Sequence, residues 1–282
     1  MSFLPTRVTE QTDALTLLSA VGDMSISKDE GKARAASIMQ QMSELQALMI
    51  GAATHQVLLV LQGIDASGKD GVVRFVVSHG DPLNVVVQPF KMPTPNELAH
   101  DFLWRVHAAV PPKGYLGIFN RSHYEDVVAA FVRGTITDTI RQQRFTHIRN
   151  FEALLHDNGT IIIKCYLHID ADEQEARLLA REQSLATAWK LAAEDWRDRT
   201  LLPTYLSAYD VAMRQTSQDY APWYVVPANR KWYRNLVIAA LLCHHMEPFR
   251  EQWSHTLQSM QRDRLSAIER VRAGLDTGKV SS

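Results

Sequence analysis

A glycine-rich segment between a strand pattern and a helix pattern constrains this chain more than any other feature. Residues 57–61 are an apolar run, and Gly63, Gly68 and Lys69 follow with the G-x-x-x-x-G-K spacing of a phosphate-binding loop. Glycines let the backbone turn tightly and expose successive N–H groups, and the next helix adds the positive end of its dipole. We expect the loop amides and Lys69 to bind phosphate, although such a turn can also be purely structural.

Further apolar runs alternate with helix-length segments along the chain. The runs lie at 85–87, 115–119, 161–169 and 223–226. The helical segments lie at 27–50, 69–79, 95–109, 122–133, 138–157, 172–184, 201–217, 230–247 and 249–273. Strands alternating with helices predict a parallel α/β sheet covered by helices on both faces. Such sheets bind ligands at the carboxyl ends of their strands.

Composition excludes several classes of protein. The chain has 282 residues, 46% hydrophobic and 22% charged, which is ordinary globular usage and excludes disordered and fibrous chains. Two cysteines cannot build a disulfide framework or a cysteine zinc site. No secretory signal is visible, and the longest apolar run, 236–243, is far short of the ~20 residues that span a bilayer. We therefore expect a cytoplasmic protein without a membrane partner. The net charge of -1 does not by itself suggest a polyanionic partner.

Two carboxylates lie in or beside the loop. Asp70 stands where a P-loop usually has the Ser or Thr that binds magnesium, and Asp65 lies inside the loop. Oxygen ligands suit a hard cation such as Mg²⁺, so Asp65 or Asp70 can supply one. Asp70 has an equally good alternative role, because an acidic residue at the start of a helix complements the helix dipole.

Polar residues also follow the run at 115–119. Asn120 stands where a neighbouring strand of a P-loop enzyme often ends in aspartate, and Arg121 comes next. A guanidinium at this edge can clamp phosphoryl oxygens bidentately. Ser122 and Glu125 have the spacing of a capping box. For Glu125, capping and a role in the site compete, and the spacing does not choose between them.

Three basic clusters are candidates for binding a long polyanion. Arg141, Arg144 and Arg149 lie in a stretch without acidic residues, where a solvated helix face is the favoured interpretation. The other clusters are Arg230, Lys231 and Arg234, and the pair Arg177 and Arg181 at i,i+4 spacing. We expect Trp104, Trp223 and Trp232 to belong to the core, because large aromatic residues are usually buried.

Five ordered blocks together resemble the polyphosphate kinase 2 family. Residues 61–71 are similar to its Walker A segment and residues 119–126 to its Walker B segment. Residues 90–94 resemble its Lys-Pro-Thr loop, with Met92 inserted, and residues 101–105 and 221–235 resemble two later blocks. The resemblance covers about residues 30 to 250. It implies a P-loop kinase-like fold and a Mg²⁺-dependent phosphotransferase acting between inorganic polyphosphate and a nucleotide.

The Asn-Arg-Ser form of the Walker B segment and Glu125 look most like class III, which uses both AMP and ADP. Glu125 resembles the position that separates monophosphate from diphosphate acceptors. The resemblance implies adenine nucleotides, with guanine left open, a bacterial cytoplasmic homodimer or homotetramer, and no nucleic-acid partner. The expected catalytic residues are Asp65, which also holds the metal, Lys69, Arg121 and Glu125. The expected substrate-binding residues are Gly63, Ala66, Ser67, Gly68, Asp70, Lys91, Asn120, Arg177, Arg181, Lys231 and Arg234.

We predict one P-loop phosphotransferase domain over residues 1–282. It has an N-terminal helical extension at 1–50, a helical lid at 172–200, and a C-terminal helix and tail at 249–282. The lid departs from the family pattern at 183–188, which precedes Trp189 and Lys190. Two other functions compete with the main one. One is an ATP-dependent kinase of a small metabolite on the same fold. The other is a nucleotide-binding switch, against which the missing Asn-Lys-x-Asp guanine motif argues.

Overall fold

A six-stranded sheet forms the centre of the computed structural model, which describes residues 3–9, 11–12, 15, 18–185, 189 and 191–273. The strand order is β1-β6-β5-β2-β4-β3. The strands are β1 (Thr6–Arg7), β2 (Gln56–Gln62), β3 (Val85–Pro89), β4 (Leu116–Asn120), β5 (Thr160–His168) and β6 (Trp223–Pro227). The last five are parallel, as predicted. The two-residue β1 pairs antiparallel with β6 and is too short for a sequence pattern to reveal.

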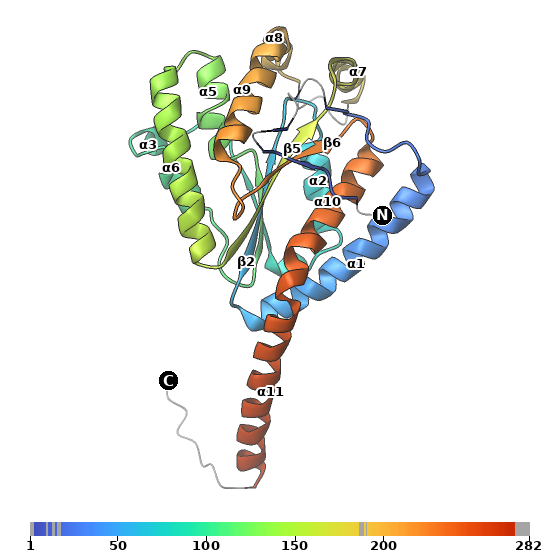
Figure 1. Ribbon diagram of the computed structural model, residues 1–282, viewed down its shortest axis with the longest axis vertical. Coiled ribbons are helices and arrows are strands. Elements are labelled where there is room, and N and C mark those ends of the chain that lie inside the picture. The colour runs from blue at the N-terminus through green and yellow to red at the C-terminus, as the bar shows by residue number, and fades with distance from the viewer. Residues whose placement is uncertain are drawn as a thin grey trace.

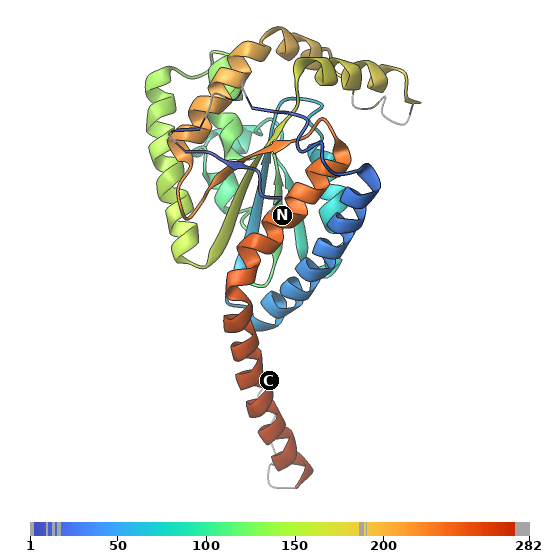
Figure 2. The same cartoon turned by 45° about the vertical axis from the view of Figure 1, so that its right-hand side comes forward.

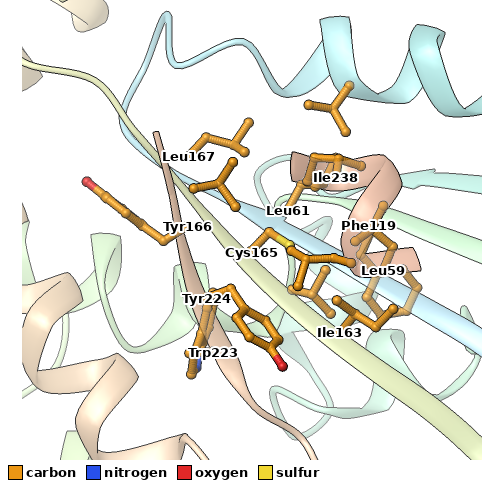
Figure 3. Packing of buried hydrophobic residues seen from close by; sticks show 14 of the residues in the cluster. Leu59, Leu61, Phe119, Ile163, Cys165, Tyr166, Leu167, Trp223, Tyr224 and Ile238 are labelled. Carbon is orange, nitrogen blue, oxygen red and sulfur yellow. The ribbon is translucent and has the colours of Figure 1, made fainter. Parts of the chain in front are cut away.

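The central strands are buried on both faces. Every residue of β2 and β5 is buried, which explains their continuous apolar runs. Leu59, Ile163 and Cys165 pack on one face of the sheet, whereas Tyr166 points to the other (Figure 3). This alternation is the pleat of the strands, and it lets both helical layers share one core.

Helices cover the two faces of the sheet in separate groups (Figure 1). One face carries α1 (Lys28–Ala52), α2 (Lys69–Val77) and α10 (Lys231–Met246). The other carries α5 (Ala129–Val132), α6 (Asp138–Asp157) and α9 (Leu202–Thr216). Ser27 caps α1, and Thr137 caps α6, each accepting a backbone N–H from the first turn.

Two pairs of elements extend beyond these layers. The helices α7 (Ala171–Glu182) and α8 (Ala193–Thr200) stand over the carboxyl ends of the strands (Figure 2). The helix α11 (Arg250–Arg272) follows η5 (Glu247–Phe249) and projects from the opposite end of the molecule (Figure 1). Among its residues only Trp253 is buried. Within the described ranges, every helix is too short or too polar to cross a bilayer.

Two predicted helices are broken in the structure. The segment at 95–109 forms α3 (Pro95–Leu98) and α4 (Trp104–His107), because Asp101 accepts the Leu103 N–H in a turn between them. The segment at 122–133 forms the short 3-10 helix η3 (His123–Asp126) and α5. A third short element, η2 (Pro82–Asn84), precedes β3, and α8 is separate from α7 within the predicted lid.

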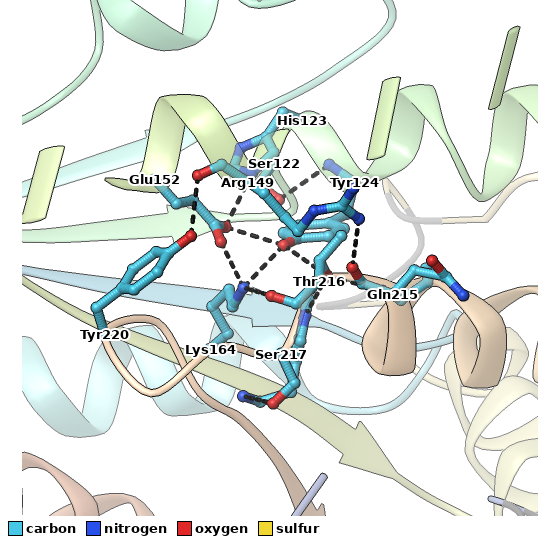
Figure 4. A network of polar contacts seen from close by, with 12 residues as sticks. Ser122, His123, Tyr124, Arg149, Glu152, Lys164, Gln215, Thr216, Ser217 and Tyr220 are labelled. Atoms are coloured by element: carbon cyan, nitrogen blue, oxygen red, sulfur yellow. Dashed lines mark hydrogen bonds and ion pairs between the residues drawn. The ribbon is translucent and has the colours of Figure 1, made fainter. Parts of the chain in front are cut away.

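A buried polar network connects β5 to the helices on one face (Figure 4). Lys164 Nζ, in β5, lies 2.5 Å from Glu152 Oε2 of α6 and donates to the Tyr124 hydroxyl at 2.9 Å and the Thr216 carbonyl at 2.8 Å. The Tyr124 hydroxyl in turn donates to Glu152 Oε1 at 2.9 Å. Lys164 and Glu152 are almost completely buried, so their charges compensate each other in the core.

The tryptophan prediction is only partly confirmed. Trp223 is fully buried, and its indole N–H donates to the Thr216 hydroxyl. Trp232 is half-buried, and the prediction is wrong for Trp104, which is 41% exposed. Trp104 stacks on His100, with ring centroids 4.1 Å apart, so it packs on a neighbouring side chain near the surface and does not fill the core.

Candidate functional site

The phosphate-binding loop connects the central strand β2 to α2. Gly63 has φ of +146° and Gly68 has φ of +101°, both in the region that favours glycine. A Cβ on Gly63 would lie 2.8 Å from the Leu167 carbonyl oxygen, and one on Gly68 would lie 2.2 Å from Arg234 Nη1. Both glycines are therefore needed for backbone shape and for room. Ala66 also has positive φ, +65°, so the loop keeps local strain of the kind found at functional sites.

Lys69 is buried at the start of α2 and points back into its own loop. Its Nζ donates to the carbonyl oxygens of Gly63, at 2.6 Å, and Ile64, at 3.2 Å. Burial, together with the nearby charge of Arg121, lowers the pKa of Lys69 to about 8. Its hydrogen-bond partners are all neutral oxygens, and the attraction of Asp65, Glu125 and Asp70 offsets only part of the effect of burial, so this ammonium has no direct counter-ion and a phosphate can supply one.

Arg121 extends from the end of β4 to the phosphate-binding loop. Its φ of +64° is unusual for a residue with a side chain, and it turns the chain at this edge of the sheet. The guanidinium Nη2 lies 2.5 Å from Asp65 Oδ1. Burial raises the pKa of Asp65, but Arg121, Lys69 and Arg181 outweigh that effect and leave the pKa below its ordinary value. Asp65 is therefore an anion, as a metal-binding role requires.

The second carboxylate, Asp70, pairs with the end of β4. Asn120 Nδ2 donates to Asp70 Oδ1 at 2.8 Å. In the usual P-loop arrangement the acid ends the strand and the neutral residue follows the lysine, whereas this chain has the two exchanged. Asp70 also lies in the first turn of α2, so dipole stabilisation and a site role are both compatible with its position.

Glu125 faces a small cavity rather than capping a helix. The Ser122 hydroxyl accepts the Tyr124 N–H, which makes Ser122 the cap of η3 without a capping box. The cavity, of about 30 Å³, also touches Gly63, Asp65 and Arg121. Burial raises the pKa of Glu125, although Arg121 and Lys69 oppose the rise. Glu125 therefore belongs to the site that contains the phosphate-binding loop.

Two further arginines line the loop from other elements. Arg177, on α7, donates to the carbonyls of Ala66 and Ala228 and pairs with Glu173. Arg234, on α10, is buried, and its Nη1 donates to the Gly68 carbonyl at 3.1 Å. Burial and the nearby Arg177 lower the pKa of Arg234 to about 10. A Cβ on Gly71 would lie 3.0 Å from Arg234 Nη2, so this glycine too leaves room for the guanidinium.

These side chains meet in one large cleft at the carboxyl ends of β2 and β4. The cleft has a volume of about 820 Å³ and brings together thirteen of the fifteen predicted site residues. They are Asp65, Ala66, Ser67, Gly68, Lys69, Asp70, Lys91, Asn120, Arg121, Arg177, Arg181, Lys231 and Arg234. The other two, Gly63 and Glu125, line the adjoining small cavity. The predicted set is thus one connected site, built from the ends of three strands and from the helices α2, α7 and α10.

The arginines of α6 do not reach this cleft. Arg141, Arg144 and Arg149 donate to the backbone carbonyls of Ala208, Asp126 and Gln215, respectively, at 2.7–2.8 Å. Arg141 is only 4% exposed. The prediction of a solvated face is therefore wrong for Arg141, and all three guanidiniums fasten α6 to neighbouring segments.

The predicted lid corresponds to α7 and α8, which stand above the cleft. Arg181 on α7 pairs with Asp195 on α8 at 2.9 Å, and Arg199 pairs with Glu175 at 2.5 Å. Trp189, which is 79% exposed, lines the cleft. Much of the departure expected at 183–188 lies outside the described residues, which omit 186–188 and Lys190.

Several residues around the site were not predicted from the sequence. Arg105 donates to the Lys91 carbonyl and pairs with Asp126, which holds the Lys91 loop beside β4. Tyr205 and Tyr209 on α9, with the pair Arg133 and Asp198, line the small cavity beside Glu125. In the sequence, only the i,i+4 spacing of the two tyrosines indicates that they share a helix face. Nothing in the sequence connects Arg133 with Asp198, because 65 residues separate them.

The donor set fits a magnesium ion that is bound mainly by substrate. No group of three or more histidine, cysteine or acidic side chains converges anywhere in the described part of the chain. Asp65 and Asp70 both line the cleft. Mg²⁺ is typically held by one or two carboxylates together with substrate phosphates, so these residues suit it.

Comparisons with known proteins agree with this geometry. The model of the polyphosphate kinase 2 family matches residues 25–253. The chain is 46% identical to an AMP/ADP-polyphosphate phosphotransferase of Meiothermus ruber over 77% of its length and 82% of that protein. It is 36% identical to an ADP-polyphosphate phosphotransferase of Rhodopseudomonas palustris, covering 83% of this chain and 85% of that one.

A solved structure gives the same result for the fold. The crystal structure of polyphosphate kinase 2 from Arthrobacter aurescens superposes with a TM-score of 0.82 at 37% identity, covering 86% of this chain and 88% of the other. The fold, the phosphate-binding loop and the sequence matches therefore lead to one conclusion. This chain is a phosphotransferase that belongs to the polyphosphate kinase 2 family.

Proposed function

We propose that this protein transfers phosphate between inorganic polyphosphate and AMP or ADP, with Mg²⁺ as its cofactor. The observation that carries the proposal is the positive charge at the phosphate-binding loop, where Lys69 and Arg234 donate to neutral oxygens and neither forms an ion pair with a carboxylate of the described residues. A buried cation without an anion is costly in a folded protein and persists where a ligand supplies the opposite charge. The names of the relatives support the choice of polyphosphate and adenine nucleotides as substrates.

In the proposed reaction, positioning and charge neutralisation do most of the work. A terminal oxygen of AMP or ADP attacks the terminal phosphorus of polyphosphate, the bridging P–O bond breaks, and the chain leaves one phosphate shorter. The attacking oxygen is already anionic near neutral pH, so no strong general base is needed. Reversal of the same steps returns phosphate to the chain.

Each residue of the cleft has a role in this proposal. Lys69 and the loop amides hold the terminal phosphate of the acceptor, and Arg121 bridges to the donor. Arg177, Arg181, Lys231 and Arg234, with Lys91 at the rim, bind the donor chain. Mg²⁺, held by Asp65 and substrate oxygens, would neutralise phosphate charge during transfer. Glu125 lies next to Arg121 and Asp65, where its side chain discriminates between acceptors with one phosphate and acceptors with two.

The other expectations also remain proposals. We propose that residues 1–282 form one catalytic domain in which 172–200 act as a lid. On the family resemblance we propose a cytoplasmic homodimer or homotetramer, with guanine nucleotides as possible further acceptors.

An end-point assay tests the proposed function. Purified protein is incubated with Mg²⁺ and either polyphosphate or ATP as donor, and with AMP, ADP, GMP or GDP as acceptor, and products are separated by chromatography. We expect ADP and ATP to form from polyphosphate and AMP, and Lys69→Ala to abolish the product. The matched control, Lys113→Ala, removes an exposed lysine outside the cleft and should leave activity unchanged. Transfer from ATP alone, to any acceptor, would instead identify an ATP-dependent kinase.

A further inference from the structure

A second groove opens beside the cleft, between the start of α1, the end of α2 and the start of α10. Its volume is about 640 Å³. Lys28 and Lys32 come from α1, Phe75 from α2, and Arg230 and Lys231 from the N-terminal end of α10. We call it the outer groove. Of the basic residues that the sequence offered as candidates for binding a polyanion, only Arg230 and Lys231 lie in it.

Lys231 connects the outer groove to the cleft, because its side chain lines both. It is the first residue of α10, and Arg234, one turn later, donates to the Gly68 carbonyl in the phosphate-binding loop. A linear anion that leaves the loop past Arg234 and Lys231 would therefore pass directly into the outer groove.

The charge of the outer groove has one sign. Lys28, Lys32, Arg230 and Lys231 line it, and no acidic side chain does. Within the described residues, none of these four cations forms an ion pair, whereas Arg34, further along α1, pairs with Glu30. The groove therefore attracts anions, even though the net charge of the whole chain is -1.

The floor of the outer groove is apolar, which strengthens this field. Phe75, Ala35 and Trp232 form part of its lining. Gly31 lets the Trp232 ring lie against α1, because a Cβ there would be 2.2 Å from the ring. Lys28 and Lys32, at i,i+4 spacing, flank that contact on the same side of the helix. Charges beside a low-dielectric wall are less screened and attract counter-ions more strongly than charges on an open surface.

We propose that the outer groove binds the distal part of a polyphosphate chain whose terminal phosphates lie in the cleft. Lys28, Lys32 and Arg230 then give the protein a preference for chains too long for the cleft alone. The inference rests on the proposed function, since it assigns a further binding segment to the same donor. A phosphate chain suits the groove because it carries negative charge along its whole length and needs no particular base or side chain to be recognised.

The test removes two charges from the groove without touching the cleft. The variant Lys28→Gln/Lys32→Gln changes exposed helix positions. Its control, Lys113→Gln/Arg264→Gln, removes the same charge from exposed positions elsewhere. For each protein we would measure the KM of long-chain polyphosphate, the inhibition constant of tripolyphosphate, and the KM of the acceptor, with thermal unfolding as the check on folding.

We expect the groove variant to raise the KM of long-chain polyphosphate about 5- to 10-fold, from two exposed ionic contacts, and to weaken its dependence on salt. Tripolyphosphate inhibition, the KM of the acceptor and kcat should stay unchanged, and the control should match the wild type. Lys32→Glu should raise the KM further.

Three results would overturn the inference. The first is an unchanged KM of long-chain polyphosphate in the groove variant. The second is an equal weakening of binding for long-chain polyphosphate and tripolyphosphate. The third is a rise in the KM of the acceptor, which would assign the groove to a nucleotide. If the wild type makes no nucleotide from polyphosphate at all, the proposed function fails instead. Direct binding of long-chain polyphosphate to the two double variants would then still decide for or against the groove.

Discussion

Two buried lysines of this protein have opposite surroundings. Lys164 lies in the core, where its ammonium meets the Glu152 carboxylate, a hydroxyl and a carbonyl. Lys69 lies in the phosphate-binding loop, where its ammonium donates to two carbonyls and a hydroxyl and forms no ion pair with any described carboxylate. The first charge is neutralised by a direct ion pair. The second has no direct counter-ion and is stabilised only at longer range by Asp65, Glu125 and Asp70, which leaves a place for an anionic ligand.

The comparison distinguishes a charge that is paired within the fold from a charge that is available to bind a ligand. Taking a charge out of water is expensive, and a built-in counter-ion repays part of that cost. A fold that omits the counter-ion accepts lower stability in exchange for affinity for an anion. Arg234, which is buried and has a lowered pKa, belongs to the second kind.

The largest expected effect follows from removing the unpaired charge. Lys69→Met should lower kcat/KM about 1,000-fold or more, because a phosphate-stabilising cation is lost. The free energy of unfolding should stay unchanged or rise, because a similarly shaped apolar chain replaces a buried charge that has no direct ion pair. Steady-state kinetics and urea unfolding check the two halves. A clear loss of stability would contradict the contrast with Lys164.

Removing one member of the paired charge should have the reverse result. Glu152→Gln should lower the free energy of unfolding by about 3–5 kcal/mol, because Lys164 is left buried without an anion. Activity per folded molecule should change little. The double variant Glu152→Gln/Lys164→Met is the matched control and should recover most of the stability in urea unfolding. Equal losses in the single and double variants would show that the charge pair is not the cause.

The pH dependence of activity should reveal the titration of Lys69. Since the pKa of Lys69 is lowered to about 8, kcat/KM should fall about tenfold per pH unit above that value as the ammonium loses its proton. Stability should change in the opposite direction. Between pH 8 and pH 10.5, about the folded and the ordinary pKa of Lys69, this lysine is protonated in the unfolded state and largely neutral in the folded state. The free energy of unfolding should therefore rise with pH in this range. A pH profile at constant ionic strength tests this. In the Lys69→Arg variant, the remaining kcat/KM should no longer fall at alkaline pH, because arginine keeps its proton there.

The smallest expected effect concerns acceptor choice. Glu125 is half-buried beside Arg121 and Asp65, so its charge would act on the phosphates that we propose to bind there. Glu125→Asn should change the ratio of AMP to ADP use by about tenfold, which corresponds to one altered contact in the site. Parallel assays with both acceptors measure the ratio, and the exposed Glu251→Asn is the control. An unchanged ratio would assign Glu125 to packing alone.

Much of the architecture could be predicted because its signals are local. The buried strands β2 and β5 are uninterrupted apolar runs, and α1 and α6 agree with their predicted ranges to within two residues. The loop between β2 and α2 has a spacing set by phosphate chemistry. These features depend on neighbouring residues, which a sequence displays directly.

The parts that could not be predicted depend on distant partners or unusual backbone. Arg141 looked solvated from its own helix, but its guanidinium meets the Ala208 carbonyl, 67 residues away. The positive φ of Arg121, which turns the chain at the end of β4, cannot be predicted from an arginine in the sequence. Ser122 and Glu125 have capping-box spacing, yet only Ser122 caps, because Glu125 turns toward the cavity.

The space around Arg234 has a consequence for how this protein can evolve. Its guanidinium fits only because positions 68 and 71 lack side chains: a Cβ on Gly68 would lie 2.2 Å from it and one on Gly71 3.0 Å. A larger residue at either glycine would become acceptable only after position 234 had lost its long side chain, and with it the guanidinium that lines the cleft. We expect relatives to change these three positions together or to keep all of them, so that they are inherited as one unit spanning 166 residues of sequence.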